Sequence, residues 1–212
     1  MKDWTGNQKS IFTTLGASNH SKHQREEFDY YATSPTAIPP LIEAMTKHKE
    51  KIARRIWENA SGENHLVNKL EEIGFTVLPT DIVERTDKTI KLDFLHDDNK
   101  WVREWLNALD GEEVNILTNP PYKFATEWVY KSMEFLREGE KLMLFLKIQF
   151  LEGIKRRELF KKYPPKYVFV FSKRENCAKN GDFVTFKTNS AVTYAWFVWE
   201  KGFKSYPQVD WI

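Results

Sequence analysis

The chain has 212 residues, of which 41% are hydrophobic and 29% charged, so it is long enough for one globular domain and too short for two independent catalytic domains. Its formal net charge of +2 is too small to indicate a nucleic-acid partner without local clustering of basic residues. The single cysteine, Cys177, excludes an internal disulfide and a multi-cysteine zinc site, and we expect no metal site.

The first 28 residues are polar and show little periodicity. We therefore expect a loose N-terminal arm at residues 1–28, followed by one domain over residues 29–212. Residues 1–10 lack the apolar core of a signal peptide. The most apolar stretch, residues 142–151, is interrupted by Lys147 and Gln149 and is too short to cross a bilayer. These features predict a cytoplasmic protein with no membrane partner.

Helices and strands are predicted to alternate along the first half of the domain. A helix begins near Pro39 and Pro40, because proline is tolerated in the first helical turn, and it buries Leu41, Ile42 and Met45 at helical spacing. The strands predicted after it are residues 56–58, 75–81, 90–95 and 114–118, and the helices between them are residues 66–73 and 101–109.

The second half of the chain continues this alternation. Its predicted helices are residues 125–136 and 154–162, and its predicted strands are residues 141–147, 167–171 and 191–199. The strand at 141–147 is almost continuously apolar, as is typical of a strand covered on both faces. Alternating strands and helices predict an α/β fold with a Rossmann-like, doubly wound, mostly parallel sheet. Ligands of such sheets bind beyond the carboxyl ends of the strands.

The turn after the first strand has the composition of a ligand site. Glu58 supplies an acid, and the small residues Ala60 and Gly62 allow a ligand to approach the backbone. The turn lacks both the Gly-x-Gly-x-x-Gly pattern and a Gly-Lys-Ser/Thr phosphate loop. A zwitterionic ligand, with an amine for a carboxylate to bind, suits it better than a dinucleotide.

Two further acids stand at the next predicted strands. Asp81 is positioned to accept hydrogen bonds from ribose hydroxyls, and an equally acceptable interpretation is an Asp that forms a turn or caps a helix. Asp93 and Phe94 suit an adenine amine and ring, although a surface Asp beside a core Phe explains them without a ligand. Neither acid decides the function alone.

An Asn-Pro-Pro-Tyr sequence follows the buried strand at 114–118. An amine conjugated into an adenine ring is a poor nucleophile, and the side-chain oxygen of Asn119 and the carbonyl of Pro120 are suited to accept its two hydrogens. Pro121 stiffens the backbone there, and Tyr122 offers a ring to stack on a base extruded from a duplex. The alternative is an ordinary Asn-Pro turn. The preceding strand and the following amphipathic helix favour the catalytic interpretation.

The chain resembles the amino-methyltransferase group of S-adenosylmethionine-dependent enzymes, and more narrowly the phage-type DNA N6-adenine methyltransferases. The resemblance covers most of the chain. It rests on residues 14–20, 29–35, 57–66, 80–81, 93–95, 119–122, 150–153 and 195–202. It implies a class I methyltransferase fold with a seven-stranded sheet whose last strand, residues 191–199, is antiparallel. It also implies a host cytoplasm, in a phage-infected or prophage-carrying bacterium.

The resemblance further implies roles for individual residues. Asn119, Pro120, Pro121 and Tyr122 would be catalytic and hold the target base. The residues that would bind S-adenosylmethionine, whose product is S-adenosylhomocysteine, are Tyr31, Thr33 and Pro35 in a closing segment, Glu58, Ala60 and Gly62 near the methionine part, Asp81 and Ile82 at the ribose, Asp93 and Phe94 at the adenine, and Asn119.

Two residues of the cofactor turn depart from the family pattern. Asn59 stands where proline is common, and Asn64 stands where a second glycine is expected. Because Asn tolerates a positive φ better than most residues, we expect the turn to survive with an altered cofactor affinity. Only about 57 residues separate the cofactor motif from the catalytic motif, so DNA must be read by small insertions.

Basic residues are concentrated near the end of the predicted domain. Between Lys147 and Arg174 there are nine Lys or Arg and two Glu, a local excess of +7. This segment is either a phosphate-facing strip or a solvated helix face followed by a loop. The candidate DNA contacts are Lys155, Arg156, Arg157, Lys173 and Arg174.

The sequence leaves alternatives open. A glutamine side chain in a protein and an adenine in RNA pose the same conjugation problem as adenine in DNA. Enzymes that methylate a protein glutamine resemble chains with a helical substrate-binding domain ahead of the fold. This sequence has only about 30 polar residues there. Double-stranded DNA is therefore the favoured partner. A catalytically inactive DNA-binding relative is a further alternative, supported by Asn64. We expect a monomer or weak dimer.

Overall fold

The computed structural model describes residues 31–107, 113–173, 175, 177–179 and 192–212, so the predicted arm at residues 1–28 lies outside the described residues. The largest feature is an eight-stranded sheet in the order β10-β7-β9-β6-β5-β2-β3-β4. In chain order its strands are β2 (Arg55–Glu58), β3 (Thr76–Asp81), β4 (Ile90–Lys91), β5 (Val114–Thr118), β6 (Lys141–Lys147), β7 (Tyr167–Val170), β9 (Tyr194–Glu200) and β10 (Gln208–Trp211).

One strand of this sheet runs against the others. β9 is antiparallel to both of its neighbours, β6 and β7, whereas the other pairings in the sheet are parallel. This confirms the mostly parallel, Rossmann-like sheet and the antiparallel strand predicted near residues 191–199. β9 is not the last strand, however, because β10 follows it and pairs with β7. β10 is short and largely exposed, so no apolar run marks it in the sequence.

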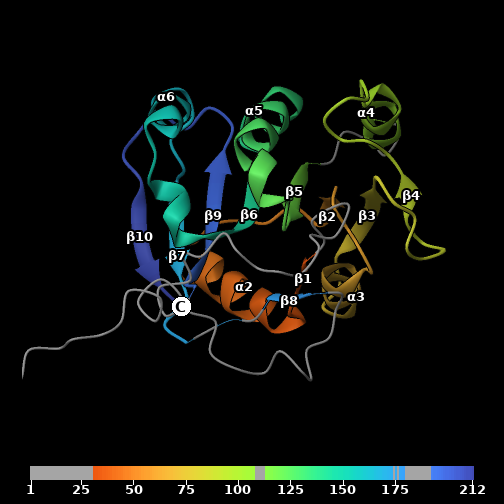
Figure 1. Ribbon diagram of the computed structural model, residues 1–212, viewed down its shortest axis with the longest axis horizontal. Helices are drawn as coiled ribbons and strands as arrows, with labels where there is room; N and C mark the ends of the chain where they lie inside the picture. The colour runs from red at the N-terminus through yellow and green to blue at the C-terminus, as the bar shows by residue number, and fades with distance from the viewer. Residues whose placement is uncertain (1–30, 108–112, 174, 176, 180–191) are drawn as a thin grey trace, which may run out of the picture.

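Helices cover both faces of the sheet (Figure 1). α4 (Lys100–Asn107), α5 (Ala125–Phe135) and α6 (Ile154–Lys162) lie on one face, and α2 (Ile38–Lys47) and α3 (His65–Glu72) lie on the other. This arrangement confirms the doubly wound prediction. Three short 3-10 helices complete the described helices: η1 (Pro35–Ala37), η2 (Tyr122–Phe124) and η3 (Ile148–Leu151).

Strand β6 explains why both layers are needed. Leu142 and Leu144 belong to a buried cluster shared with α5, whereas Met143 and Phe145 belong to a second cluster shared with α2 and α3. Successive side chains of a strand point to opposite faces, so an uninterrupted apolar strand requires cover on each side. Burying each of these four side chains stabilises the fold by ~1.5–3 kcal/mol.

The predicted strand at residues 90–95 is the clearest error in the element bounds. β4 contains only Ile90 and Lys91. The chain turns after it because the Asp93 carboxylate accepts hydrogen bonds from the backbone N–H groups of Leu95, at 3.1 Å, and His96, at 3.2 Å. A side chain that bonds to nearby backbone in this way competes with strand pairing.

A separate two-stranded antiparallel sheet joins distant parts of the chain. β1 (Tyr31–Thr33) pairs with β8 (Cys177–Lys179), and Thr33 lies opposite Cys177. The pairing holds the segment before α2 against the segment between β7 and β9. It therefore fixes the backbone position of Thr33.

Candidate active site

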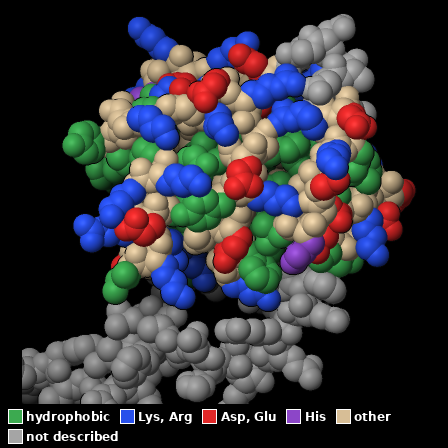
Figure 2. Space-filling view, turned by 90° about the horizontal axis from the view of Figure 1, so that it is seen from above, with side chains coloured by type: hydrophobic (Ala, Val, Ile, Leu, Met, Phe, Trp, Pro, Cys, Tyr) green, Lys and Arg blue, Asp and Glu red, His purple; other side chains and the backbone are tan. Residues whose placement is uncertain are grey.

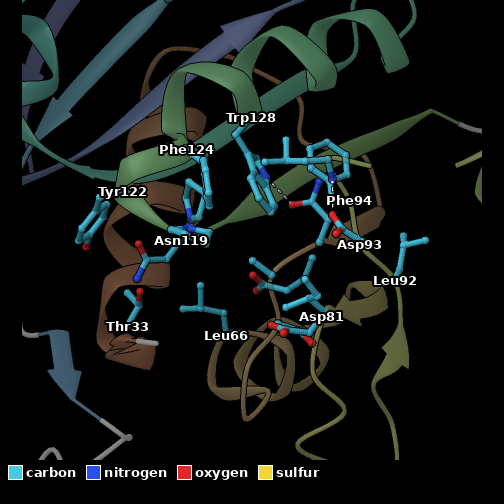
Figure 3. Close-up of a pocket in the computed structure, with 18 of the residues that line it drawn as sticks. Thr33, Leu66, Asp81, Leu92, Asp93, Phe94, Asn119, Tyr122, Phe124 and Trp128 are labelled. Carbon is cyan, nitrogen blue, oxygen red and sulfur yellow. Dashed lines mark hydrogen bonds between the residues drawn. The ribbon is translucent and has the colours of Figure 1, made fainter. Parts of the chain in front are cut away.

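One cavity lies at the carboxyl ends of β2, β3 and β5, where sheets of this kind bind ligands. Figure 3 shows Thr33, Asn119 and Tyr122 at one side of it and Asp93 and Phe94 at the other. The predicted site residues that line this cavity are Thr33, Glu58, Ala60, Asp81, Ile82, Asp93, Phe94, Asn119, Pro120, Pro121 and Tyr122. Among the described side chains, those of the predicted residues Pro35 and Gly62 do not line it, and the side chain of Tyr31 lies outside the described part of the chain.

The turn after β2 adopts the backbone that its small and Asn residues permit. Gly62 has φ 53° and Asn64 has φ 64°, both in the left-handed region. The expected survival of the turn with Asn64 in place of glycine is thus confirmed. The Asn64 amide also donates to the Thr89 hydroxyl at 3.2 Å, which ties the turn to the loop before β4.

Asp81, at the end of β3, holds this turn in place. Its Oδ2 accepts a hydrogen bond from the Gly62 N–H at 2.8 Å, and its Oδ1 accepts one from the Val83 N–H at 2.9 Å. The Arg85 guanidinium lies 3.4 Å from Oδ1. A carboxylate has about four lone-pair sites, two on each oxygen, so Oδ2, which accepts one of these bonds, keeps acceptor capacity for a ligand. Gly62 therefore supports the site through its backbone N–H, which positions the Asp81 carboxylate.

Glu58 is an acid enclosed by the protein. It is 2% exposed, and its Oε2 has no hydrogen-bond partner among the described residues. Burial, and after it the nearby Asp81 carboxylate, raise the pKa of the Glu58 carboxyl to about 8. A buried carboxyl group with one oxygen unpaired is a costly arrangement that a cationic ligand would relieve.

Asp93 and Phe94 combine the two interpretations left open by the sequence. The Asp93 carboxylate is engaged in the turn after β4 and lies 2.8 Å from the His96 ring, yet it also faces the cavity. Phe94 is buried, with its ring centroid 4.6 Å from that of Trp128 and 5.3 Å from that of Trp57. Both residues are thus structural and also available to a ligand.

Sequence reasoning missed how Asn59 and Trp128 complete the site. Trp128 on α5 donates its indole N–H to the Asn59 carboxamide oxygen at 2.9 Å, and both side chains are buried and line the cavity. The bond joins the turn after β2 to the helix that follows the Asn-Pro-Pro-Tyr loop. The sequence marks Asn59 as a departure from the proline of the family pattern, but nothing in the sequence pairs it with Trp128.

The Asn-Pro-Pro-Tyr loop leads directly from β5 into η2 and α5. Pro120 is buried and Asn119 is half-buried, and the Pro121 carbonyl accepts a hydrogen bond from the Phe124 N–H at 2.9 Å. Asn119 lines the same cavity as Glu58 and Asp81. Figure 3 shows Asn119 and Asp81 in it. The loop is therefore held rigidly between a buried strand and a helix, with its carboxamide at the cavity.

The sequence matches no protein-family model and no curated protein, but solved structures share its fold. A candidate RNA methyltransferase from Pyrococcus horikoshii is 10% identical with a TM-score of 0.53, over 92% of this chain and 99% of that chain. The type IIG restriction endonuclease BpuSI is 14% identical with a TM-score of 0.51, over 78% of this chain and 25% of that chain. A protein described as a hemolysin, from Lactococcus lactis, is 11% identical with a TM-score of 0.51, over 80% of this chain and 90% of that chain.

The chain has a Rossmann-like fold, which it shares with this candidate RNA methyltransferase. The family resemblance implied seven strands. The sheet contains them in the order β7-β9-β6-β5-β2-β3-β4, and β9 is the antiparallel one. β10 is an addition at the edge.

The candidate DNA contacts differ in their surroundings. Lys155, Arg157 and Lys173 are exposed, whereas Arg156 donates from Nε to the Glu152 carbonyl at 2.7 Å and lies over the Phe150 ring. Arg156 thus holds the loop before α6. Arg174 lies outside the described residues. The DNA-binding role of these side chains stays a prediction.

The basic segment from Lys147 to Arg174 does not form one strip. Lys147 ends β6 at the cavity edge of the sheet, whereas Lys166 precedes β7 at the opposite edge. Lys166 lies 2.6 Å from a Glu50 carboxylate oxygen and 2.9 Å from one of Glu200. Figure 2 shows Lys and Arg interspersed with acidic side chains on the face covered by α4, α5 and α6. Lys147 and Lys166 therefore do not share one surface, because α6 reverses the chain direction between them.

Within the described ranges, no cluster of three or more His, Cys, Asp or Glu side chains is arranged to hold a metal ion. None of the helices in the described part of the chain combines the length and the apolar character needed to span a membrane. These findings concern the described residues only.

Proposed function

We propose that this protein is a DNA adenine methyltransferase that transfers a methyl group to the N6 amine of adenine in double-stranded DNA. S-adenosylmethionine is the methyl donor that the class I methyltransferase fold implies. The observation that carries the proposal is the single cavity that joins Asn119 and Pro120 to Glu58, Asp81 and Asp93. A donor site and an amine-binding loop are thereby adjacent.

The chemistry of the lining residues fits this methyl donor. Two buried oxygens in the cavity, Thr33 Oγ1 and Glu58 Oε2, have no hydrogen-bond partner among the described residues. Leaving such a group unpaired costs about 1–3 kcal/mol, which a ligand with donors offsets. Glu58 would hold the ammonium group of the donor, Asp81 its ribose hydroxyls, and Asp93 with Phe94 its adenine.

Catalysis would depend on two fixed acceptors. The Asn119 side-chain oxygen and the Pro120 carbonyl accept the two N6 hydrogens, which draws the nitrogen lone pair out of conjugation with the adenine ring. When bound, S-adenosylmethionine supplies a methyl carbon to which the amine nitrogen bonds as the carbon–sulfur bond breaks, and the nitrogen then loses one proton to water. Because the loop lies between β5 and α5, its acceptors need no reorganisation.

Tyr122 is the proposed stacking surface for the target base. An enzyme that modifies N6 must extrude adenine from the duplex, since the paired amine is inaccessible to an enclosed cavity. Tyr122 lines the cavity at the loop that carries Asn119, so an extruded base stacked on it would present its amine to the acceptors. By resemblance to phage-type enzymes, we propose that this occurs in the cytoplasm of an infected or prophage-carrying bacterium.

The proposal is tested by sequencing that detects methylated bases in DNA from bacteria expressing the protein. We expect N6-methyladenine at one short sequence, absent when Asn119→Ala is expressed. In a purified assay with labelled S-adenosylmethionine, duplex DNA should be labelled while RNA and a glutamine-containing protein substrate are not. Because a candidate RNA methyltransferase shares the fold, labelling of RNA alone would replace the DNA proposal with an RNA one.

Calorimetry with S-adenosylmethionine tests the remaining alternative, a relative that has lost activity. We expect saturable binding, because Asn64 adopts the left-handed backbone that the turn requires. Folded protein that binds no cofactor would support an inactive DNA-binding protein instead.

A further inference from the structure

Lys147 lies beside the proposed base-stacking residue although the two are distant in sequence. It is the last residue of β6, which pairs with β5, and β5 leads into the Asn-Pro-Pro-Tyr loop. The Lys147 ammonium lies 4.9 Å from the centroid of the Tyr122 ring. Sheet topology thus puts a cation over the ring that we assign to the target base.

The charge of Lys147 is not neutralised by the described protein. Among the described residues, no carboxylate lies within ion-pair distance of its ammonium. Lys141, at the other end of the same strand, contrasts with it: its ammonium lies 3.5 Å from Glu50 and 3.2 Å from Glu200. Within the described ranges, carboxylates therefore neutralise the cation at the edge away from the cavity, and the one beside the cavity is available to another anion.

The ring under Lys147 has a fixed support. Tyr194 on β9 lies with its ring centroid 6.3 Å from that of Tyr122, and it stacks on Phe145 at 4.9 Å. Tyr194 and Phe145 are both buried, so this pair forms a rigid base for Tyr122. The lysine, in contrast, has a flexible four-carbon stem and is half-buried.

We propose that Lys147 binds the backbone phosphate of the nucleotide whose base is extruded onto Tyr122. This inference rests on the proposed function and adds a phosphate-binding residue to it. In the free protein the ammonium covers the ring. When DNA binds, the phosphate takes the ammonium in a charge-assisted hydrogen bond, and the base occupies the ring face that the ammonium has left. Lys147 thereby couples DNA binding to base placement.

The test compares Lys147→Gln with Lys161→Gln, which removes the same charge from the far end of α6. Lys161 is exposed and lies 2.7 Å from Glu158, so its loss should leave activity unchanged. KM is measured on a duplex with the site found by sequencing, and a second duplex with 2-aminopurine at the target adenine, which has no N6 amine, reports extrusion by its fluorescence. For Lys147→Gln we expect about a tenfold or greater rise in KM for DNA and a salt slope reduced by about 1. The rise in 2-aminopurine fluorescence that accompanies base extrusion should also be lost in Lys147→Gln.

Lys147→Arg keeps the charge and should recover most of the activity, whereas the dissociation constant for S-adenosylmethionine should be unchanged in all variants. Equal KM and salt slope for Lys147→Gln and the wild type, with the wild type active on DNA, would overturn this inference alone. A wild type that methylates no DNA would overturn the proposed function and this inference with it. If Lys147→Gln lowers the unfolding midpoint, failure of the folded Arg variant to recover KM would equally reject the phosphate role.

Discussion

Asn119 contributes an acceptor at the amine, whereas the other proposed cofactor residues lie on other loops of the same cavity. Asn119→Ala should therefore leave the dissociation constant for S-adenosylmethionine nearly intact and reduce methyl transfer by about 10²–10³-fold or more. Calorimetry and single-turnover transfer give the two quantities. Equal transfer by the variant would reject the mechanism.

Asp81 should show the opposite behaviour. Asp81→Ala removes the proposed ribose acceptor and also the partner of the Gly62 N–H, so we expect a rise of about tenfold or more in the dissociation constant for the cofactor. Asp81→Asn keeps one acceptor and should be affected less. An unchanged constant in a folded Asp81→Ala variant would mean that the ribose is bound elsewhere.

The buried Glu58 predicts a pH dependence of stability. The pKa of Glu58 is about 8 in the folded protein, against about 4.5 for an ordinary Glu. Because the folded value is raised, the free energy of unfolding should fall as pH rises from 4.5 towards 8, by about 1.4 kcal/mol per unit. Glu58→Gln has no charge to bury and should exceed wild type by on the order of 3 kcal/mol at pH 7.

Urea unfolding of both proteins at pH 5 and pH 8 measures this difference. Parallel pH profiles would show that Glu58 titrates normally. The raised pKa of Glu58 also implies that this carboxyl group releases a proton when a cationic methyl donor binds. Calorimetry in buffers of different ionisation enthalpy detects that proton.

At the scale of single residues, the sequence predicted just under half of the residues that line the cavity, because acids and small residues at strand ends are a local signal. Glu58, Asp81 and Asn119 were found in this way. The Asn59–Trp128 hydrogen bond was not, because its partners are brought together only when α5 packs on the sheet. Pairings of this kind depend on tertiary structure and leave no spacing to detect.

At the scale of elements, the bond between Trp128 and Asn59 holds α5 to the cofactor turn. Trp128→Phe keeps an aromatic ring but removes the N–H, leaving a buried carboxamide oxygen unpaired. We expect a loss of about 1–3 kcal/mol in the free energy of unfolding, together with weaker cofactor binding. Denaturant unfolding measures the first effect. As a matched control, Trp211→Phe on the exposed edge strand should change little.

Element prediction succeeded where an apolar period was strong and failed where polar contacts decided. The strand at 141–147 and the helix at 154–162 were predicted at their observed bounds. The strand at 90–95 was too long because the Asp93 carboxylate ends it, and β10 was missed because its side chains are mostly exposed. The sequence left the basic segment open between a phosphate-facing strip and a solvated helix face, because the surface that each charge faces depends on the direction of α6.

At the scale of the whole molecule, β10 and the cavity lie at separate parts of the sheet. Removing residues 207–212 eliminates the pairing with β7 and the ion pair between Asp210 and Lys47. We expect cofactor affinity to be retained, because β2, β3 and β5 are unaffected. The midpoint of thermal unfolding should fall, and light scattering should reveal aggregation, because the newly exposed edge of β7 can pair with other chains. Loss of cofactor binding in the folded truncated protein would contradict this separation.

The position of β9 also bears on how the chain is made. β9 is inserted between β6 and β7, both of which leave the ribosome before it. Until β9 emerges, the apolar edge of β6 has no partner on that side, and β7 has no neighbour in the sheet to join. The sheet can therefore close only after residues 194–200 have emerged, and a nascent chain stalled before residue 194 should be a target for chaperones.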